Sequence, residues 1–473
     1  MFRKFLWVFI EKGAVMTIQF VTLLVLSRLL SPQEYGIYGI MLIFISISDL
    51  LVDSGFGGAI IQKKYVTQID INTLFLTNTG IAACLYGLLF LISGLVQNFY
   101  GVENLSSYLR VLGLSIVFFS FSIVPNSLMM KELRFRKLAI ITVISSLASS
   151  IMAIILATQG LGVWVLVFQQ VLNSLFLAVL LWLFSGVHVG LKYSKDSFKG
   201  LWSFGSNLLF ANLLSTLYNN ISSSIIPKIS SLNQAGYFNQ ARRLQSLPNN
   251  IIYMSIDKAA FPILSQEKTI DNVLEQGRYI NSFVFALCAC LFPALSLASL
   301  PIIKILLGNE WLEAAPYLSI LFWAGFGLLI HALYRNMFKS AGFTNVIFKV
   351  EIINTIVGIS ILLAAIAGGI MFIIYGIVLS SIISASLWFY FANKKFAYSI
   401  KQQITDYIPT LLVAVLAYLL CLGGSKLFSG LYSTLFWGVG LVMVYFIFGY
   451  IVKDSAITSI LKFCRRRMKI SKK

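Results

Sequence analysis

The chain has 473 residues, of which 58% are hydrophobic and only 11% charged, and its mean hydropathy is +0.87. Soluble domains carry about 25% charged residues, so this composition excludes a water-soluble fold and predicts a membrane protein. The 36 Lys and Arg residues outnumber the 17 Asp and Glu residues. Because no soluble basic domain is present, we expect this excess to reflect membrane topology rather than nucleic-acid binding.

Apolar stretches of about 20 residues, the length that crosses a bilayer, follow one another along the chain. The basic start, Phe2–Lys12, lacks a signal-peptide cleavage site, and we expect it to lie along the membrane surface. The fourteen predicted spans are 13–30, 36–58, 71–96, 105–128, 138–158, 161–185, 200–226, 236–263, 279–302, 311–337, 346–368, 371–392, 408–427 and 432–452. The seventh and eighth are rich in Asn, Ser and Gln, which is tolerated only where a span faces protein or water. We predict an all-α polytopic membrane protein.

Basic residues gather on one side of the predicted membrane. In total, 26 of the 36 Lys and Arg residues lie at the two ends or in the even-numbered connections between spans. Cytoplasmic loops are enriched in Lys and Arg, so both termini are predicted to be cytoplasmic. The five cysteines and two histidines show neither disulfide nor metal-ligand spacing. We expect no metal, no cofactor and no catalytic residue.

A similar pattern recurs 200 residues apart, at the ends of the first and seventh spans. It relates Arg28, Ser31, Gly36 and Tyr38 to Lys228, Ser231, Gly236 and Phe238. A second similarity relates Lys131 and Phe135 to Lys339 and Phe343. If this is a repeat rather than chance in an apolar chain, two parallel six-helix units enclose a substrate, as in transporters. We therefore predict an N-terminal lobe at 1–192, a C-terminal lobe at 193–400, and two additional helices with a basic cytoplasmic tail at 401–473.

Four motifs carry a resemblance to a known family. They are Leu26–Gly36 (LSRLLSPQEYG), Asp49–Lys63 (DLLVDSGFGGAIIQK), Met130–Phe135 (MKELRF) and Gly236–Leu244 (GYFNQARRL). In this order they resemble the lipopolysaccharide, O-antigen or exopolysaccharide repeat-unit flippases, which are polysaccharide exporters of the multidrug/oligosaccharidyl-lipid/polysaccharide (MOP) superfamily. The resemblance covers essentially the whole chain.

This resemblance implies two six-helix lobes around a cationic cavity. It also implies a function: an undecaprenyl-diphosphate-linked oligosaccharide is flipped across the bacterial inner membrane by alternating access, for surface polysaccharide biosynthesis. The implied partners are this lipid-linked substrate, membrane lipids, a polysaccharide polymerase and a chain-length regulator.

Cations within the spans or next to their ends are the candidates for binding a diphosphate, because an ion is costly in hydrocarbon and Arg binds phosphate oxygens bidentately. The candidates are Arg28, Lys228, Arg242, Arg243, Arg335 and Lys339. The alternative role of Arg28, Lys228 and one of the two adjacent arginines is an anchor at the membrane interface. The alternative for Arg335 and Lys339, four apart near the cytoplasmic end of their span, is the general enrichment of basic residues on the cytoplasmic side. Adjacent residues of a helix point about 100° apart, so at most one of Arg242 and Arg243 faces a cavity squarely.

Acidic and amide side chains supply the remaining candidates. Asp49 and Asp53 lie four apart on one helix face, where they are predicted either to bind a proton or Na⁺ or to pair with a cation or cap a helix. The sugar-contacting candidates, whose alternative role is helix packing, are Asn207, Asn212, Tyr218, Asn219 and Asn220. We also expect Asp257–Lys258 and Lys349–Glu351 to be internal ion pairs.

Three other functions stay open at this point. A cation-coupled multidrug exporter of the same superfamily is less favoured, because drug cations favour an acidic cavity and the candidate residues are basic. A flippase for a peptidoglycan precursor would carry the same class of lipid diphosphate. A membrane polysaccharide polymerase or glycosyltransferase is disfavoured, since the chain has no long loop and no Asp-x-Asp motif.

Overall fold

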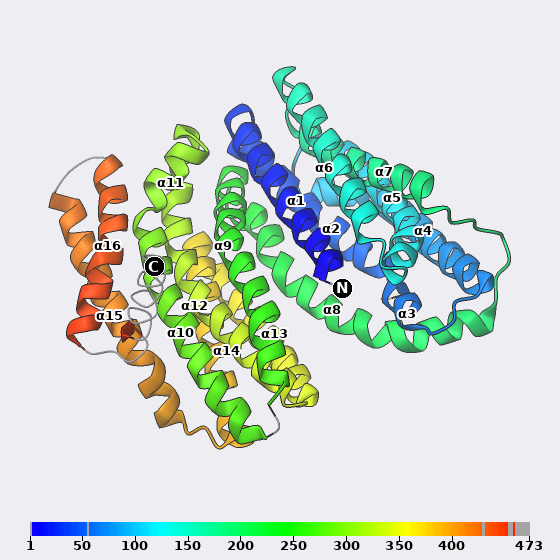
Figure 1. The fold of residues 1–473 in the computed structure, drawn as a ribbon. Helices are drawn as coiled ribbons and strands as arrows, with labels where there is room; N and C mark the ends of the chain where they lie inside the picture. Colours follow the sequence, from blue (N-terminus) through cyan, green and yellow to red (C-terminus); the bar gives the residue numbers. More distant parts are fainter. Residues whose placement is uncertain (1, 54–55, 268, 428–430, 453–456, 459–473) are drawn as a thin grey trace. The chain divides into compact units, whose positions relative to one another are not determined.

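The computed structural model describes residues 2–53, 56–267, 269–427, 431–452 and 457–458 (Figure 1). These residues are almost entirely helical, and no strand occurs among them, which confirms the predicted all-α class. Contacts divide the chain into two compact units, Met1–Gly236 and Tyr237–Lys473. The lobe boundaries predicted from the repeat, at 192 and 400, stay a prediction, and most of the basic tail lies outside the described residues.

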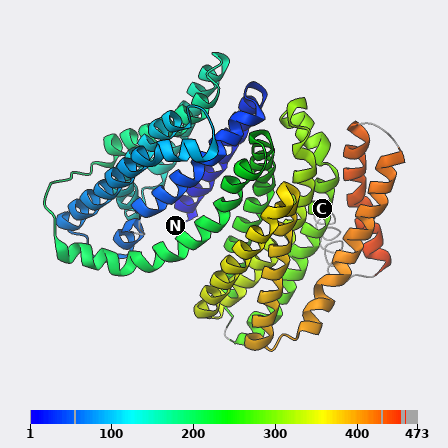
Figure 2. The same ribbon diagram turned by 180° about the vertical axis from the view of Figure 1, so that it is seen from behind.

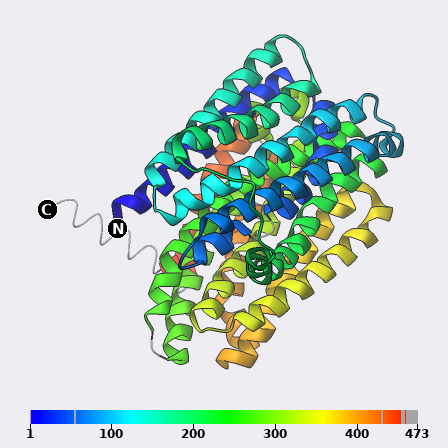
Figure 3. The ribbon, with the colours of Figure 1, turned by 90° about the vertical axis from the view of Figure 1, so that its right-hand side faces the viewer.

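The first unit is built around α5, which packs against both α4 and α7. Its helices are α1 (Phe2–Leu29), α2 (Pro32–Asp53), α3 (Phe56–Gln62), α4 (Gln68–Tyr100), α5 (Leu105–Lys131), α6 (Phe135–Thr158), α7 (Val163–Ser185), α8 (Lys195–Ile229) and the start of α9 (Leu232–Ser265). α6 packs between α1 and α7, and Figure 3 shows α6 and α7 running side by side. α8 packs along α2, α3 and α4. A buried apolar core that includes Ile40, Leu112 and Val167 joins α2, α4, α5 and α7.

The start of the chain differs from the prediction. Phe2–Lys12 is not a separate surface helix, because α1 runs unbroken from Phe2 to Leu29. Glu11 and Lys12 are good helix formers and no proline interrupts the segment, so its charges do not end the helix.

The second unit is built around α10 and α12. Its elements are the rest of α9, α10 (Ile270–Leu297), α11 (Ser299–Leu306), η1 (Asn309–Trp311), α12 (Ala314–Ser340), α13 (Thr344–Ala365), η2 (Ile366–Gly368), α14 (Gly369–Phe396), α15 (Ile400–Leu427) and α16 (Leu431–Ile451). α14 packs against α12 and α13, while α15 and α16 pack together against α10 (Figure 2). The predicted span 279–302 is broken after Leu297, because the ring of Pro301 clashes with the carbonyl four residues before it.

Ten helical segments of the described chain are long and apolar enough to cross a membrane. One of them, 344–396, covers both α13 and α14. α8 and α9 have 35 and 34 residues, enough for a span, but their polar composition keeps them outside these ten. The protein is therefore a multi-pass membrane protein, while the count of fourteen spans stays a prediction.

The predicted 200-residue register is confirmed at the junctions α1–α2 and α8–α9. α1 and α8 end at Leu29 and Ile229, and α2 and α9 begin at Pro32 and Leu232. The hydroxyl oxygens of Ser31 and Ser231 accept hydrogen bonds from the backbone N–H of the third residue after each, at 3.4 Å and 3.2 Å. The same N-capping geometry thus starts both helices.

The second similarity was misaligned by one residue. The turns after α5 and α12 each contain a backbone hydrogen bond of 2.9 Å between residues five apart in the chain. Arg134 N–H donates to the Met129 carbonyl, and Phe343 N–H donates to the Phe338 carbonyl. Leu133 and Gly342, with φ of 57° and 77°, occupy the same left-handed position. The register is therefore 209 residues, so Lys131 and Lys339 are not equivalent. A left-handed residue of this kind ends each of the two helices, and its position is seen in the backbone conformation rather than in the sequence.

Two glycines of the repeat let α2 and the start of α9 meet backbone to backbone. A Cβ at Gly36 would lie 2.0 Å from the carbonyl oxygen of Leu232, and a Cβ at Gly236 would lie 1.9 Å from that of Pro32. The contact is reciprocal, as two equivalent junctions require. Only glycine allows an approach of this kind, so these positions tolerate no side chain.

We expect Gly36→Ala and Gly236→Ala each to lower the free energy of unfolding by about 3 kcal/mol, because the opposing atoms belong to rigid backbone. Thermal denaturation of the purified protein in detergent measures this. The control is Gly87→Ala on α4, where a Cβ meets nothing within 4 Å. Equal melting temperatures for Gly36→Ala and Gly87→Ala would contradict the contact.

Candidate functional site

Polar side chains from three helices surround Arg335 inside the second unit. Arg335 lies on α12, about 8 Å along the helix axis from its last residue. Its Nε lies 3.9 Å from Oε1 of Glu351 on α13, and its guanidinium donates a hydrogen bond to the hydroxyl of Tyr253 on α9. The Arg335 side chain is still 46% exposed. The cation is therefore held in place from two sides without being enclosed.

Asp257 joins the same part of α9 to α12. Its Oδ1 accepts a hydrogen bond of 2.7 Å from the side-chain amide of Asn336, which also donates to the Ala332 carbonyl at 3.0 Å. Asn336 is buried, whereas Asp257 is exposed. The predicted pairing of Asp257 with Lys258 stays a prediction, and the Asp257 carboxylate also has a partner on the neighbouring helix, Asn336.

Glu351 has a second partner, His331, which precedes Arg335 by one turn of α12. The Nε2 of His331 lies 3.3 Å from Oε1 of Glu351. On the other side of the ring, the indole N–H of Trp388 on α14 donates to Nδ1 at 3.0 Å. Glu351 was predicted to pair with Lys349, but residues two apart on a helix point in different directions. The carboxylate reaches α12 instead.

His331, Tyr253 and Trp388 were not among the residues predicted from the sequence. One signal was available, because His331 and Arg335 are four residues apart and so share a face of a helix. Two cationic or polar groups on one face of a membrane helix require a polar partner on a neighbouring helix. Which helix supplies that partner is decided only by packing.

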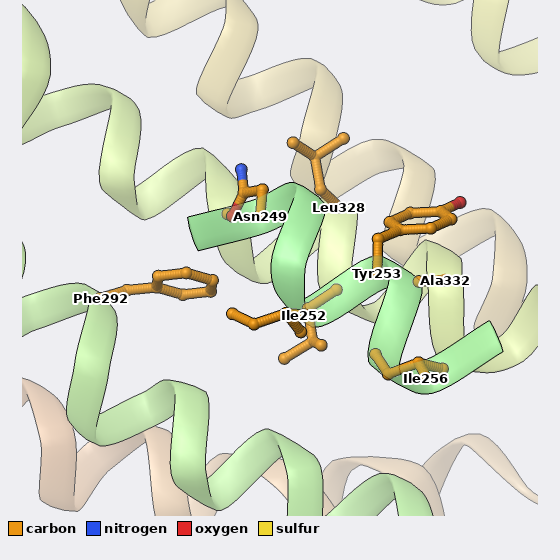
Figure 4. A pocket seen from close by; sticks show the side chains of 9 residues that line it. Asn249, Ile252, Tyr253, Ile256, Phe292, Leu328 and Ala332 are labelled. Atoms are coloured by element: carbon orange, nitrogen blue, oxygen red, sulfur yellow. The ribbon is translucent and has the colours of Figure 1, made fainter. Parts of the chain in front are cut away.

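An apolar pocket lies beside this cluster, between α9, α10 and α12 (Figure 4). Its lining residues are Asn249, Ile252, Tyr253, Ile256, Phe292, Gly325, Leu328, Leu329 and Ala332. Tyr253 therefore contributes its ring to the pocket and its hydroxyl to Arg335. Pro248 and Pro262 flank this part of α9, and each removes one helical hydrogen bond.

The other predicted diphosphate residues lie elsewhere. Arg28 and Lys228 are exposed in the last turns of α1 and α8, as the repeat requires. The Lys228 ammonium donates to the backbone carbonyl of Phe99 and lies 4.6 Å from the centre of its ring. This contact fastens α8 to the end of α4, which is a structural role compatible with the predicted anchor.

The remaining cations divide between exposed and ring-stacked positions. Arg242 is half-buried, 6.0 Å from the ring of Phe238, whereas Arg243 is exposed. Whether one of the two faces a cavity stays a prediction. Lys339 lies 4.3 Å from the ring of Phe261 and so joins α12 to α9 one turn beyond Arg335.

The two acidic candidates of α2 have different environments. Oδ1 of Asp49 is buried, and no hydrogen-bond partner for it is found within the described chain. Asp53, the last residue of α2, accepts a hydrogen bond from the backbone N–H of Gly57 at the start of α3. Asp53 thus caps a helix, as one alternative predicted, and ion coupling stays a prediction for both.

The predicted sugar-contacting residues all lie on α8. The side chains of Asn207, Asn212, Tyr218 and Asn219 lie outside the described part of the structure. The Asn220 amide is half-buried and donates to the Thr216 carbonyl of its own helix at 2.9 Å.

Residues 25–316 match the family model described as polysaccharide biosynthesis protein, which covers more than half of the chain. The chain belongs to this family. Among similar proteins, the succinoglycan biosynthesis transport protein ExoT of Rhizobium meliloti (strain 1021) is 23% identical over 389 residues, which is 82% of this chain and 76% of ExoT. The lipopolysaccharide biosynthesis protein WzxC of Escherichia coli (strain K12) is 23% identical over 426 residues, 86% of this chain and 85% of WzxC.

Solved membrane transporters have a similar fold. The lipid II flippase MurJ in an inward closed conformation has a TM-score of 0.77 at 14% identity and covers 96% of this chain and 100% of its own. An inward-facing multidrug resistance MATE transporter has a TM-score of 0.62 at 14% identity, and the match covers 82% of this chain and 98% of the transporter. At these identities the likeness establishes the fold alone, so it does not separate a flippase from a drug exporter.

We expect Asp49→Ala and Asp53→Ala to change stability in opposite directions. Asp49→Ala removes an unsatisfied buried oxygen and should raise the free energy of unfolding by about 1 kcal/mol. Asp53→Ala removes a helix cap and should lower it by about 1 kcal/mol. Thermal denaturation of both variants beside the wild type checks this pair, and a loss of stability in both would contradict the assignment.

Proposed function

We propose that this protein is a flippase that moves undecaprenyl-diphosphate-linked oligosaccharide repeat units across the bacterial inner membrane by alternating access. The products would serve surface polysaccharide biosynthesis, such as O-antigen, capsule or exopolysaccharide. Family membership and the names of the relatives support the polysaccharide part of this proposal. The multi-pass helical fold supports transport rather than chemistry.

The observation that carries the proposal is the position of Arg335. Arg335 lies about 8 Å from the end of α12, and an ionisable residue within a membrane helix is costly and normally has a function. Arg335 is half-exposed, and its contacts with Tyr253 and Glu351 orient the guanidinium. A guanidinium carries five N–H donors and binds two phosphate oxygens at once, which suits a diphosphate. The polyprenyl tail would stay in lipid.

The other candidate residues extend this proposal. Arg28, Lys228, Arg242, Arg243 and Lys339 would attract the diphosphate along its path or anchor the helices, and the amides of α8 would bind the sugars. Positive residues in alternate loops support an orientation with both termini in the cytoplasm. A polysaccharide polymerase and a chain-length regulator would act on the delivered product as partner proteins.

A multidrug exporter has the same fold, since a MATE transporter is among the similar structures. The names of the sequence relatives favour polysaccharide, because ExoT, WzxC and TuaB, a teichuronic acid biosynthesis protein of Bacillus subtilis (strain 168), all act in polysaccharide biosynthesis by name. The basic candidate residues would also repel a cationic drug.

We expect Arg335→Ala to slow transbilayer movement of undecaprenyl-diphosphate oligosaccharide about 10- to 100-fold. Loss of a charge-assisted hydrogen bond costs about 1.5–3 kcal/mol, and each 1.4 kcal/mol is tenfold. Arg335→Lys should give an intermediate rate, because lysine keeps the charge without the planar donor pair. The measurement uses purified protein in liposomes, with Arg28→Ala and Asp53→Asn as further variants.

The matched control is Arg136→Ala on α6, an exposed arginine 5.5 Å from the ring of Trp7, which should flip at the wild-type rate. Wild-type movement with no effect of Arg335→Ala would remove Arg335 from the site. Absence of movement, together with efflux of a cationic dye, would favour the drug exporter and overturn the proposed function.

A further inference from the structure

The pocket between α9, α10 and α12 is apolar, although it lies beside a charged cluster (Figure 4). The atoms that face it are apolar, and the pocket is small and open on one side. Leu328, one of its lining residues, is 44% exposed. An open apolar pocket with a charged group at its edge suits a ligand in which an apolar part adjoins a charged part.

On α12, this pocket begins one helical turn from Arg335. Ala332 lines the pocket, and Arg335 follows three residues later, about 4.5 Å further along the axis. Residues three apart share a face of a helix, so the pocket and the cation lie on the same side of α12. Leu328 and Leu329 continue the pocket away from the charge.

Tyr253 of α9 joins the pocket to the cation. Its ring lines the pocket, and its hydroxyl accepts a hydrogen bond from the Arg335 guanidinium. Figure 4 shows the ring beside Ala332, with the hydroxyl directed away from Phe292 and Ile252. One side chain therefore forms the boundary between the apolar pocket and the charged group.

A buried amide fixes the two walls of the pocket relative to each other. The side chain of Asn336, which is 1% exposed, donates to Asp257 of α9 at 2.7 Å and to the Ala332 carbonyl of α12 at 3.0 Å. These bonds hold α9 against α12 at the level of the pocket. A site that is formed before its ligand arrives loses less free energy in ordering when it binds.

The chemistry of this pair of sites distinguishes between the parts of a lipid diphosphate. In a prenyl diphosphate, the first isoprene unit is bonded directly to a phosphate oxygen, so apolar, methyl-branched carbon begins next to the charge. A sugar would leave its hydroxyls without partners in the pocket. In a phospholipid, glycerol separates the phosphate from the acyl chains, so a chain in the pocket would not leave the phosphate one helical turn away on Arg335.

We propose that the pocket lined by Tyr253, Leu328 and Ala332 binds the first isoprene unit of the lipid diphosphate whose phosphates lie on Arg335. The rest of the polyprenyl chain stays in lipid. The pocket thereby selects prenyl diphosphates among lipid diphosphates and orients the diphosphate on the guanidinium. This inference rests on the proposed function, because it assigns a further part of the same substrate to the same site.

The first test uses a short, water-soluble prenyl diphosphate. Calorimetric titration of the purified protein in lipid nanodiscs compares geranyl diphosphate, inorganic pyrophosphate and geraniol. Geranyl diphosphate should bind about tenfold more tightly than pyrophosphate, which is the effect of burying about two methylene groups. Geraniol, which has no phosphate, should bind at least about tenfold more weakly than geranyl diphosphate. Equal affinities for the two diphosphates, equal affinities for geraniol and geranyl diphosphate, or absence of geranyl diphosphate binding would each overturn the proposal.

The second test changes the pocket without changing the cation. Ala332→Leu fills the pocket and should abolish the preference for geranyl diphosphate while pyrophosphate still binds. Because Ala332 is buried and a larger side chain there risks misfolding, Leu328→Ala at the 44% exposed position provides a second variant, which should reduce the preference about threefold. A preference that survives both changes in folded protein would refute the pocket.

Two further variants serve as controls. Ala364→Leu makes the same substitution at an exposed position of α13 and should bind both diphosphates as the wild type does. Tyr253→Phe keeps the ring and removes the hydroxyl next to Arg335. It should change the affinities for both diphosphates by the same factor and leave their ratio unchanged. A changed ratio in Ala364→Leu would show that the preference arises outside the pocket and would contradict the assignment.

The third test separates this inference from the proposed function. Liposome assays compare flipping of two lipid diphosphates that carry the same oligosaccharide, one on undecaprenol and one on a straight, saturated alkyl chain. The wild type should flip the prenyl lipid about tenfold faster, and Ala332→Leu should flip both at similar rates. Flipping of both lipids at equal rates by the wild type would overturn the pocket and leave the proposed function intact. A pocket-dependent preference for geranyl diphosphate, without flipping of either lipid, would do the reverse.

Discussion

Polar groups inside the spans must find their partners within the protein, because the hydrocarbon of a bilayer offers neither donors nor acceptors. The second unit shows how this constraint organises a structure. Arg335 requires an anion and receives Glu351 from α13, and Glu351 in turn receives His331. Nδ1 of His331 accepts from Trp388. Each polar group thus has its partner on a neighbouring helix, and together these contacts hold α12 to α13 and α14.

The attachment of α9 follows from the same constraint. Three contacts hold its inner part to α12: Tyr253 with Arg335, Asp257 with Asn336, and Phe261 with Lys339. All three involve a polar or charged group, and the pocket between α9, α10 and α12 leaves part of the apolar surface unfilled. A helix attached through polar contacts can change partners when a charge changes, whereas a close-packed apolar helix cannot do so without opening a cavity. This is the property that a transport cycle needs.

The two junctions of the repeat, α1–α2 and α8–α9, share their local structure and contact each other. Both junctions use a serine cap at the start of the second helix, and their glycines pack against the backbone of the other junction. Because the two junctions are equivalent and contact each other, the same residue type is required at the same position of both. That residue is glycine, since a side chain at Gly36 or Gly236 would collide with a backbone carbonyl of the other junction. In the first copy Glu34 also accepts a hydrogen bond from the Ser31 N–H, which completes a capping box, and Gln234 occupies the equivalent position in the second copy.

Hydropathy and local pattern were sufficient for the helices, for the multi-pass class and for the 200-residue register at Gly36 and Gly236, because each of these depends on residues close together in the chain. They also made Arg335 a candidate, since a charge in an apolar stretch is visible without a structure. Tertiary structure alone decided that Glu351 pairs with His331 rather than Lys349, that Trp388 donates a hydrogen bond to His331, and that the second similarity has a register of 209 residues. The physical reason is that these relations depend on which helix faces pack together and where a helix ends, and neither is encoded in the order of neighbouring residues.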